Sequence, residues 1–476
     1  MKSVALHNLG CKVNSYEMEV MQQMLQEKGY QIVPFDTRAD IYIINTCTVT
    51  NIADRKSRQM LHRAKAKNPD AVVVAVGCYV QTGREVVEKD PAIDLAVGNN
   101  KKKELVSILE EYLAEREASR SIDKSLHGTS VIDINQECGY EEMTLKQTAE
   151  HTRAYIKIQD GCNQFCSYCI IPYARGRVRS RRAEDILEEV KGLARSGYRE
   201  VVLTGIHISS YGIDFDEETW IKGSAQTRLK DDAGQVCHNE GHRDYRGRTK
   251  LIDLVERIHE VEGIDRIRLG SLEPRIITRE NAERLAALPK LCPHFHLSLQ
   301  SGCDETLKRM NRHYTSGEYL RSVELLREVF DHPAVTTDVI VGFPGETREE
   351  FEATKAFLEK VKFYEMHIFK FSRRHGTKAD TMPDQVADQE KAARSNELLL
   401  MERAQSLEFR RRYIGKEAEV LFEETKEIGG KTYQLGHTRD YVKAALKTDE
   451  NLSNCQKRVK FTDFLTDEIL NCISLH

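Results

Sequence analysis

Three cysteines near the middle of the chain have the spacing of metal ligands. Cys162, Cys166 and Cys169 lie four and three residues apart in the sequence GCNQFCSYC. Structural zinc sites and common iron–sulfur motifs use four protein ligands, so three thiolates leave one position of a bound iron open to an external ligand. A zinc ribbon or unrelated buried thiols are the alternative interpretations. We refer to these three residues as the central cysteine triad.

A run of cations follows the central cysteine triad. Guanidinium groups pair well with carboxylates and phosphates, so this segment predicts an anion site beside the metal site. The cations are Arg175, Arg177, Arg179, Arg181 and Arg182.

A second group of cysteines follows three predicted strands near the N-terminus. Cys11, Cys47 and Cys78 stand at the ends of the apolar runs SVALHNLG, IYIINTC and AVVVAVGCYV, which are separated by helical periodicity. The alternation predicts an α/β layer with parallel strands, whose carboxyl ends meet at one edge. We therefore expect these three residues, the N-terminal cysteine triad, to converge. Small buried hydrophobic thiols are the alternative interpretation.

Length and charge set the broad class of the protein. The 476 residues are enough for about three domains. The 71 basic and 75 acidic residues nearly cancel, so any binding of nucleic acid must come from local basic patches. The first residues lack the apolar core of a signal peptide, and no apolar run approaches the roughly 20 residues of a membrane span. We expect a cytoplasmic protein without a membrane partner, in which clustered thiols hold metals.

The order of predicted elements gives an α/β protein with three folded parts. Residues 1–113 form the N-terminal α/β domain, and 114–147 are polar and weakly periodic, which is typical of a linker. Six predicted strands separated by helices in 148–380 indicate an open partial (βα)6 TIM barrel. A charged insertion near 212–249 interrupts it; its Cys237–His238 pair lacks further ligands at zinc-finger spacing. Residues 381–476 predict a connecting helix and a small β-barrel.

The cysteine segments resemble a known enzyme family. The pattern C-x3-C-x2-C is the signature of radical S-adenosylmethionine enzymes, and GCNQFCSYCIIPYARG is similar to their methylthiotransferase branch. LGCKVNSYE, NTCTVT and VGCYVQ resemble the N-terminal motifs of that branch. The resemblance implies two [4Fe-4S] clusters, one on each triad. The central cluster would cleave S-adenosylmethionine to a 5′-deoxyadenosyl radical, and the N-terminal cluster, with its own open iron, would supply sulfur methylated by a second S-adenosylmethionine.

The same resemblance implies a substrate and partners. LGCKVN, NTCTVT and YCIIPYARGRVRSR are most similar to the branch that acts on threonylcarbamoyladenosine in tRNA. The implied reaction is C2 methylthiolation of N6-threonylcarbamoyladenosine (t6A) at position 37, with the tRNA anticodon region, an electron donor and a sulfur source as partners. The alternatives are isopentenyladenosine-37 of tRNA, an aspartate of a ribosomal protein, and a non-catalytic RNA-binding iron–sulfur redox sensor.

Small and polar residues at other strand ends of the predicted barrel are candidates for the S-adenosylmethionine pocket. Small residues would let the nucleoside and the methionine carboxylate approach the backbone, and carboxylate or amide oxygens could accept from amino or ribose groups. Ordinary turn chemistry is the alternative for each. The candidates are Thr204, Gly205, Ser271, Glu273, Gln300, Ser301 and Gly342.

The C-terminal segment resembles the TRAM domain, an RNA-binding barrel. GHTRDYVKA matches its GHT-x-x-Y stretch. Cations would bind phosphates and rings would stack on bases, although a charge run is more often a solvated face. The candidates are Arg410, Arg411, Arg412, Lys416, Lys431, Arg439 and Lys443, with Tyr433 and Tyr441.

Overall fold

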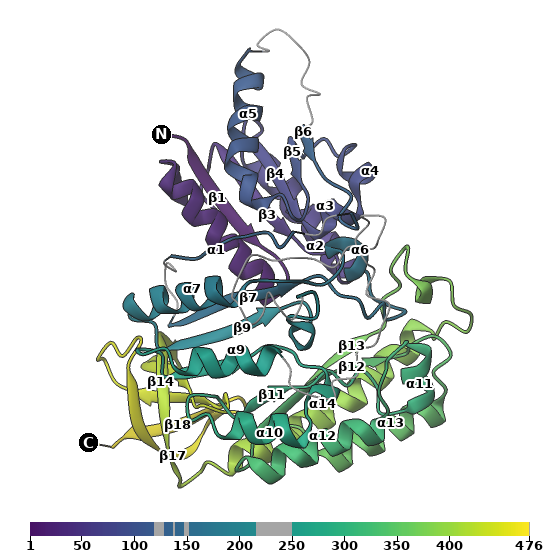
Figure 1. Cartoon of the computed structure of the whole chain (residues 1–476), viewed down its shortest axis with the longest axis vertical. Helices are drawn as coiled ribbons and strands as arrows, with labels where there is room; N and C mark the ends of the chain where they lie inside the picture. Colours follow the sequence, from purple (N-terminus) through teal and green to yellow (C-terminus); the bar gives the residue numbers. More distant parts are fainter. Residues whose placement is uncertain (119–127, 137–138, 147–151, 216–249, 476) are drawn as a thin grey trace.

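The computed structural model describes residues 1–118, 128–136, 139–146, 152–215 and 250–475. From residue 216 onward, the predicted insertion near 212–249 lies outside the described residues. Figure 1 shows an N-terminal α/β layer above a layer of barrel strands and helices, with a small β-barrel at the C-terminal side. None of the described helices is long and apolar enough to cross a membrane.

The N-terminal layer is a parallel sheet in the order β2-β1-β3-β4-β5-β6, as far as the described residues show. Both faces of β3 and β4 are buried, which explains their continuous apolar sequences. The predicted strands are β1 (Ser3–Asn8), β3 (Ile41–Thr46) and β4 (Val72–Gly77); β2 (Gln31–Val33), β5 (Leu95–Val97) and β6 (Gly128–Ser130) add to them. The helices are α1 (Lys12–Glu27), α2 (Asn51–Lys67), α3 (Cys78–Thr82), α4 (Arg84–Val87) and α5 (Leu105–Ala118).

The N-terminal sheet extends into the segment interpreted as a linker. β6 pairs in parallel with β5, in the register Leu95↔Gly128 to Val97↔Ser130. The strand lies within 114–147, and α5 also continues past residue 113. A three-residue strand shows no period of its own, which is why the sequence there reads as linker.

Six parallel strands form the central unit in the described part of the chain, in agreement with the predicted partial barrel. β7, β9 and β10 make one sheet and β11, β12 and β13 another, and the bridges Ile267↔Leu291 and Leu272↔Leu297 join β10 to the β11 region. The strands are β7 (Arg153–Asp160), β9 (Glu200–Gly205), β10 (Arg266–Leu269), β11 (His294–His296), β12 (Ala334–Val341) and β13 (Glu365–Lys370), with the short β8 (Arg179–Ser180) antiparallel to β7. The helices are α6 (Ile171–Arg175), α7 (Ala183–Arg195), α9 (Lys250–His259), α10 (Arg279–Ala286), α11 (Asp304–Arg309), α12 (Ser316–Val329) and α13 (Arg348–Val361).

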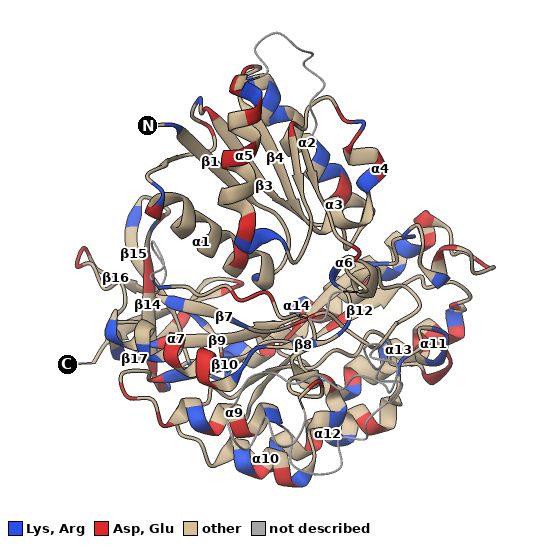
Figure 2. Cartoon of the chain, turned by 45° about the horizontal axis from the view of Figure 1, so that its top comes forward, with Lys and Arg blue, Asp and Glu red and all other residues tan. Residues whose placement is uncertain are grey.

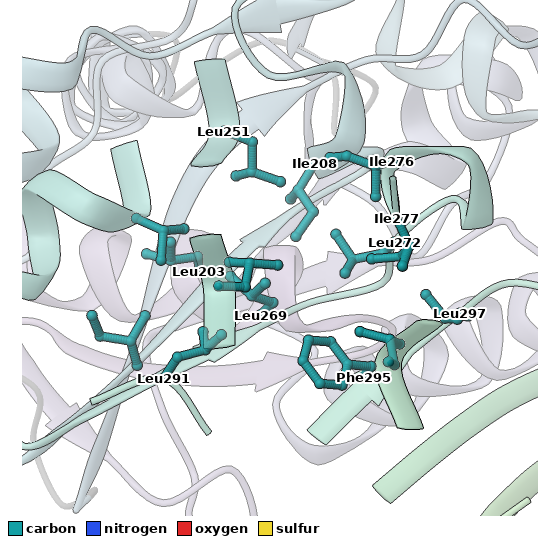
Figure 3. Packing of buried hydrophobic residues seen from close by; sticks show 14 of the residues in the cluster. Leu203, Ile208, Leu251, Leu269, Leu272, Ile276, Ile277, Leu291, Phe295 and Leu297 are labelled. Carbon is teal, nitrogen blue, oxygen red and sulfur yellow. The ribbon is translucent and has the colours of Figure 1, made fainter. Parts of the chain in front are cut away.

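Alternate residues of the barrel strands face the helices and the barrel interior. Leu203, Leu269 and Phe295 of three strands point into one apolar cluster (Figure 3). Val339 of β12 lies in the same cluster, and Ile368 of β13 packs against it. Since side chains alternate along a strand, the residues between them face the interior.

The C-terminal unit is a closed barrel in the order β14-β15-β16-β18-β17. It follows α14 (Asp388–Arg411), and its core includes Val420, Phe461 and Leu470. Arg266 and Arg268 of β10 donate to carbonyl oxygens of this barrel, so the two units are in direct contact. The predicted small β-barrel is present. Its strands are β14 (Glu417–Ile428), β15 (Lys431–His437), β16 (Lys443–Lys447), β17 (Gln456–Thr466) and β18 (Ile469–Ser474).

Candidate functional site

The structure brings the N-terminal cysteine triad together at one sheet edge. β1, β3 and β4 are adjacent and parallel, and each cysteine stands just beyond one of them. A Cβ added at Gly10 would lie 3.1 Å from Sγ of Cys47, so the loop that carries Cys11 packs closely against Cys47. Burial raises the pKa of Cys47 to about 11, and the neighbouring Cys78 and Cys11 act in the same direction.

Asparagine side chains fix the loops of the N-terminal cysteine triad. Asn14 donates to the carbonyl oxygens of Leu9 at 2.7 Å and Thr46 at 3.1 Å, which precede Cys11 by two residues and Cys47 by one. Asn99 lies with Nδ2 at 3.4 Å from Sγ of Cys78 and donates to the Ala174 carbonyl of α6 at 2.7 Å. Neither role was predicted from the sequence, because the partners of Asn14 in α1 and of Asn99 in a loop depend on the tertiary structure.

The central cysteine triad lies on the loop between β7 and α6. Gly161 enters it with a φ of +70°, and a Cβ there would lie 1.9 Å from the Arg177 carbonyl oxygen, so the turn requires glycine. Burial raises the pKa of Cys169 to about 12, with Cys166 adding to the shift, and raises that of Cys162 as well. The three side chains therefore lie close enough to interact.

Hydrogen-bond donors surround the central thiols. Arg312 approaches Sγ of Cys166 with Nη1 at 3.2 Å, and the Gln164 peptide nitrogen lies 3.5 Å from Sγ of Cys162. Such donors stabilise thiolate charge and tune a bound metal. All six cysteines are free thiols, and each triad offers three sulfur ligands. The donor sets fit iron–sulfur clusters held by three cysteines; Arg312 was not predicted from the sequence.

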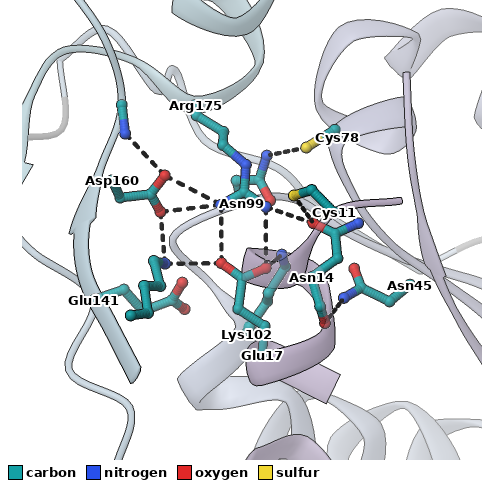
Figure 4. Close-up of polar contacts among 12 residues, drawn as sticks. Cys11, Asn14, Glu17, Asn45, Cys78, Asn99, Lys102, Glu141, Asp160 and Arg175 are labelled. Atoms are coloured by element: carbon teal, nitrogen blue, oxygen red, sulfur yellow. Dashed lines mark hydrogen bonds and ion pairs between the residues drawn. The ribbon is translucent and has the colours of Figure 1, made fainter. Parts of the chain in front are cut away.

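A cluster of buried charges lies beside Cys11 and Cys78 of the N-terminal cysteine triad (Figure 4). The carboxylate of Glu17 on α1 forms ion pairs with Nζ of Lys157 at 2.7 Å and with Nη1 of Arg175 at 2.9 Å. It also pairs with Lys102. Asp160, two residues before Cys162, binds Lys157 at 2.6 Å and Arg175 at 3.1 Å. We call these five residues the buried ion cluster. It joins α1 of the N-terminal layer to β7 and α6 of the barrel.

Three of the five arginines that follow the central triad are buried against other parts of the protein and do not form the expected anion site. Arg175 belongs to the buried ion cluster, Arg179 donates to its carbonyl oxygen at 2.9 Å, and Arg181 pairs with Glu189. All three are fully buried. Arg177 stacks on Phe165 at 4.4 Å from the ring centroid. Glu17 and Glu189, the acids that pair with Arg175 and Arg181, lie outside the run, so the run appears cationic only when read locally.

Among the predicted pocket residues, Glu273 is a buried carboxylate that contacts the loop of the central cysteine triad. It lies 3.4 Å from Nε2 of His207 and accepts from Gln164 of the central loop at 3.3 Å. Burial alone would raise its pKa, but the hydrogen bond and charge of His207, with Arg312 and Arg275, lower it to about 2. Thr204 and Gly205 end β9, and Gln300 is buried with a φ of +71°.

Two of the predicted pocket residues have local structural partners, and a third is exposed. Ser301 is bonded to Thr354 at 3.0 Å and accepts from the Cys303 peptide. At Gly342, a Cβ would lie 2.3 Å from Cγ of Lys391, so the close approach of α14 requires glycine. Ser271 is exposed. A cofactor-binding role of these three residues stays a prediction.

Part of the predicted RNA face is used inside the protein. Arg410 is buried against Glu365 at 2.6 Å, and Arg439 donates to the Leu291 carbonyl at 2.8 Å. Tyr441 stacks on His437, and Tyr433 is buried. Figure 2 shows cations and anions interspersed over the surface. Lys443 is half-buried, and the candidates that remain exposed are Arg411, Arg412, Lys416 and Lys431.

Two protein families match the two cysteine-bearing units. Residues 156–358 match the family described as the radical SAM superfamily, and residues 3–98 match the uncharacterized protein family UPF0004. The first range contains the central cysteine triad and the second the N-terminal cysteine triad.

Curated relatives match almost the whole chain. It is 38% identical over 461 residues to "Threonylcarbamoyladenosine tRNA methylthiotransferase MtaB" of Bacillus subtilis (strain 168), covering 97% of this chain and 94% of that protein. Identity to the protein of that name from Aquifex aeolicus (strain VF5) is 37%, covering 90% and 95%. Identity to the "tRNA-2-methylthio-N(6)-dimethylallyladenosine synthase" of Carboxydothermus hydrogenoformans is 33%, covering 97% of each.

A solved structure shares the fold. The radical S-adenosylmethionine methyltransferase TsrM from Kitasatospora setae superposes with a TM-score of 0.52 at 15% identity, covering 80% of this chain and 74% of that one. At this identity, the likeness concerns the arrangement of the elements alone.

Proposed function

Because the chain belongs to the radical S-adenosylmethionine tRNA methylthiotransferases, we propose that it methylthiolates C2 of t6A at position 37 of tRNA, converting t6A to ms2t6A. The choice of substrate rests on sequence identity to the relatives. Identity is 34–38% to the relatives whose names specify threonylcarbamoyladenosine and 32–34% to those whose names specify dimethylallyladenosine. The motifs around Cys11, Cys47 and Cys169 favour the same branch.

The proposal includes two [4Fe-4S] clusters, one on each cysteine triad, and S-adenosylmethionine. When bound, these groups supply the radical that removes an unactivated hydrogen and the sulfur that replaces it. The chain itself has to hold both sets of thiols at one cavity. The buried ion cluster serves this purpose, since it fixes α1, which follows Cys11, against β7, which leads to Cys162.

Side chains around the two triads would bind and orient the reactants. Glu273 is ionised because its pKa is about 2, so it can accept hydrogen bonds from amino or ribose hydroxyl groups of S-adenosylmethionine. Thr204 and Gln300, at neighbouring strand ends, could add polar contacts. Arg312 holds positive charge beside Cys166. Its role is to stabilise negative charge on the sulfur ligands.

The partners follow from the same proposal. The exposed cations Arg411, Arg412, Lys416 and Lys431 would contact the phosphates of the tRNA anticodon region. An external electron donor and a sulfur source complete the reaction, since neither an electron nor a sulfur atom can come from these side chains catalytically.

Analysis of tRNA nucleosides tests the substrate. Cells that lack the protein should lose ms2t6A and accumulate t6A, as measured by mass spectrometry of digested tRNA. Loss of the methylthio form of isopentenyladenosine instead would assign the chain to the other tRNA branch. Loss of the methylthio group of a ribosomal-protein aspartate would assign it to the third.

A further inference from the structure

The inner wall of the barrel carries a polar group that the proposed chemistry does not use. His296, Asp338 and His367 belong to β11, β12 and β13. Asp338 pairs directly with His367 in the strand register. Their neighbours Phe295, Val339 and Ile368 pack towards the helices, so the three polar side chains face the barrel interior.

These three side chains are held in a defined arrangement. Nε2 of His296 lies 3.3 Å from a carboxylate oxygen of Asp338, and Nδ1 lies 3.0 Å from the Thr336 hydroxyl. The rings of His296 and His367 are stacked, with centroids 5.9 Å apart. His367 is exposed, and the other two are half-buried. The group therefore offers hydrogen-bond donors and acceptors to a molecule inside the barrel.

An exposed aromatic ring lies next to this group on the same strand. Phe369 is two residues after His367, so it projects from the same face of β13, and it is 47% exposed. Its register partner Ile340 is in contact with a separate apolar cluster. An apolar ring left open on the wall of a barrel provides a surface for a flat apolar partner.

We infer that Asp338, His367 and Phe369 bind the base of the substrate nucleoside after it leaves the RNA stack, and that His296 orients Asp338. Aromatic stacking and hydrogen bonds to base edges are the usual means of holding an unstacked base. Phe369 stacks on the purine, while Asp338 and His367 bind its polar edge. The inference rests on the proposed function, since it assumes a modified adenosine as substrate.

The position of the wall suits this role. The peptide nitrogen of Gln300, a predicted cofactor-pocket residue, donates to the Asp338 carbonyl at 2.8 Å, so this wall adjoins the proposed S-adenosylmethionine pocket. A pocket of about 450 Å³ reaches His367 from the side of the C-terminal barrel, and its lining mixes cations such as Arg403 and Lys443 with acids such as Glu402 and Asp467.

A bound divalent metal is the competing interpretation of the same polar group. Ligand atoms of His296, Asp338 and His367 all lie within 4.8 Å of one another, and two imidazoles with a carboxylate can bind zinc or iron. A metal ion would leave the Phe369 ring uncovered, whereas a base covers the ring and binds the polar group together. The geometry therefore favours the base.

Binding of two matched RNAs tests the inference. One anticodon stem-loop carries t6A at position 37, and the other is abasic there; both affinities are measured by fluorescence anisotropy with the cluster-loaded protein. The wild type should prefer the base by about 5- to 150-fold, the range for stacking one base on an aromatic ring. Phe369→Ala should remove most of this preference without changing affinity for the abasic RNA, which also reports that the variant is folded.

Further variants separate the outcomes. Asp338→Asn and His367→Ala should reduce the preference, and Leu400→Ala, which truncates a 70% exposed side chain on α14, should leave it unchanged. Full preference in Phe369→Ala would overturn the inference. So would one bound zinc per chain that His367→Ala removes while the preference persists. If ms2t6A remains in cells lacking the protein, t6A is not the substrate. A base preference that depends on Phe369 would still show that this residue binds a base.

Discussion

Arg374 donates from Nη1 to a carboxylate oxygen of Asp54 over 2.7 Å, and this pair connects the loop after β13 to α2, the helix after Cys47. Its second terminal nitrogen donates to the Thr48 hydroxyl at 2.6 Å. Arg374 is only 6% exposed. The contact therefore fixes the Cys47 loop relative to the barrel, through residues other than those of the buried ion cluster.

Arg374→Ala should uncouple the two halves of the reaction. Under the proposed function, deoxyadenosine formation requires only the central triad and should persist. Methylthiolation should fall by roughly 10- to 100-fold, because small misplacements of reacting groups have effects of this size. The free energy of unfolding should fall by about 1–3 kcal/mol, since Asp54 and Thr48 lose a buried donor. Chromatographic assay of both products and urea denaturation measure these effects.

Arg373→Ala is the matched control for that prediction. Arg373 is the preceding residue and contacts Asp380 within its own loop. Both products should form in the wild-type ratio in this variant. A similar drop of deoxyadenosine and methylthio product in Arg374→Ala would mean that the residue stabilises the fold without positioning the N-terminal unit.

Replacing one cysteine of each triad should separate their roles. Reconstituted wild type should hold about eight irons, and Cys47→Ala and Cys162→Ala about four each. Cys162→Ala should abolish deoxyadenosine formation, and Cys47→Ala should retain part of it while losing sulfur insertion. Equal loss of both products in the two variants would refute this division. Iron analysis and product assays provide the measurements.

The buried ion cluster should make stability depend on pH in the acid range. Burial alone would raise the pKa of Glu17, but Arg175, Lys102 and Lys157 outweigh it and hold the pKa well below its ordinary value. A lowered folded pKa stabilises the protein above the unfolded value of about 4.3, and this contribution is lost as pH falls below it. Urea midpoints at pH 7, 5 and 4 should fall steeply below pH 5 in the wild type.

Glu17→Gln should lower stability at pH 7 and weaken that dependence. Breaking a buried ion pair costs about 3–5 kcal/mol, so the variant should be less stable at neutral pH and lose less on acidification. Glu27→Gln, at an exposed position of α1, is the control and should follow the wild type. An unchanged pH profile in Glu17→Gln would show that another group governs acid unfolding.

The exposed cations beside the C-terminal barrel should determine the salt dependence of tRNA binding. Each phosphate contact removed lowers the slope of log affinity against log salt by about one. Lys416→Ala combined with Lys431→Ala should therefore reduce the slope by up to about two, as measured by filter binding across salt concentrations. Lys89→Ala, an exposed site on the N-terminal unit, should have no effect. An unaffected slope in the double variant would place the RNA elsewhere.

The long elements of the fold were predictable because their sequences carry a period. β3 and β4 are continuous apolar runs, and the six barrel strands alternate with amphipathic helices. β2, β5 and β6 were missed because three residues each are too few to show alternation. Their pairing depends on neighbours in the sheet.

The cysteine positions were predictable for a different reason, since parallel strands place their ends at one edge. Charged partners were not predictable. Arg175 reads as part of a cationic run, and only the fold shows that Glu17, 158 residues away, neutralises it. Arg312 and Asn99 are isolated polar residues in loops, so their positions beside sulfur atoms depend on tertiary structure alone.

The buried ion cluster also limits how this protein can be recombined. Glu17 and Lys102 come from the N-terminal unit, and Lys157, Asp160 and Arg175 from the barrel. Either unit expressed alone would expose or bury unpaired charge. A chimaera with the N-terminal unit of a relative would need an acid and a cation at the two positions that this unit contributes. The N-terminal unit can therefore be replaced only by one that carries both buried charges.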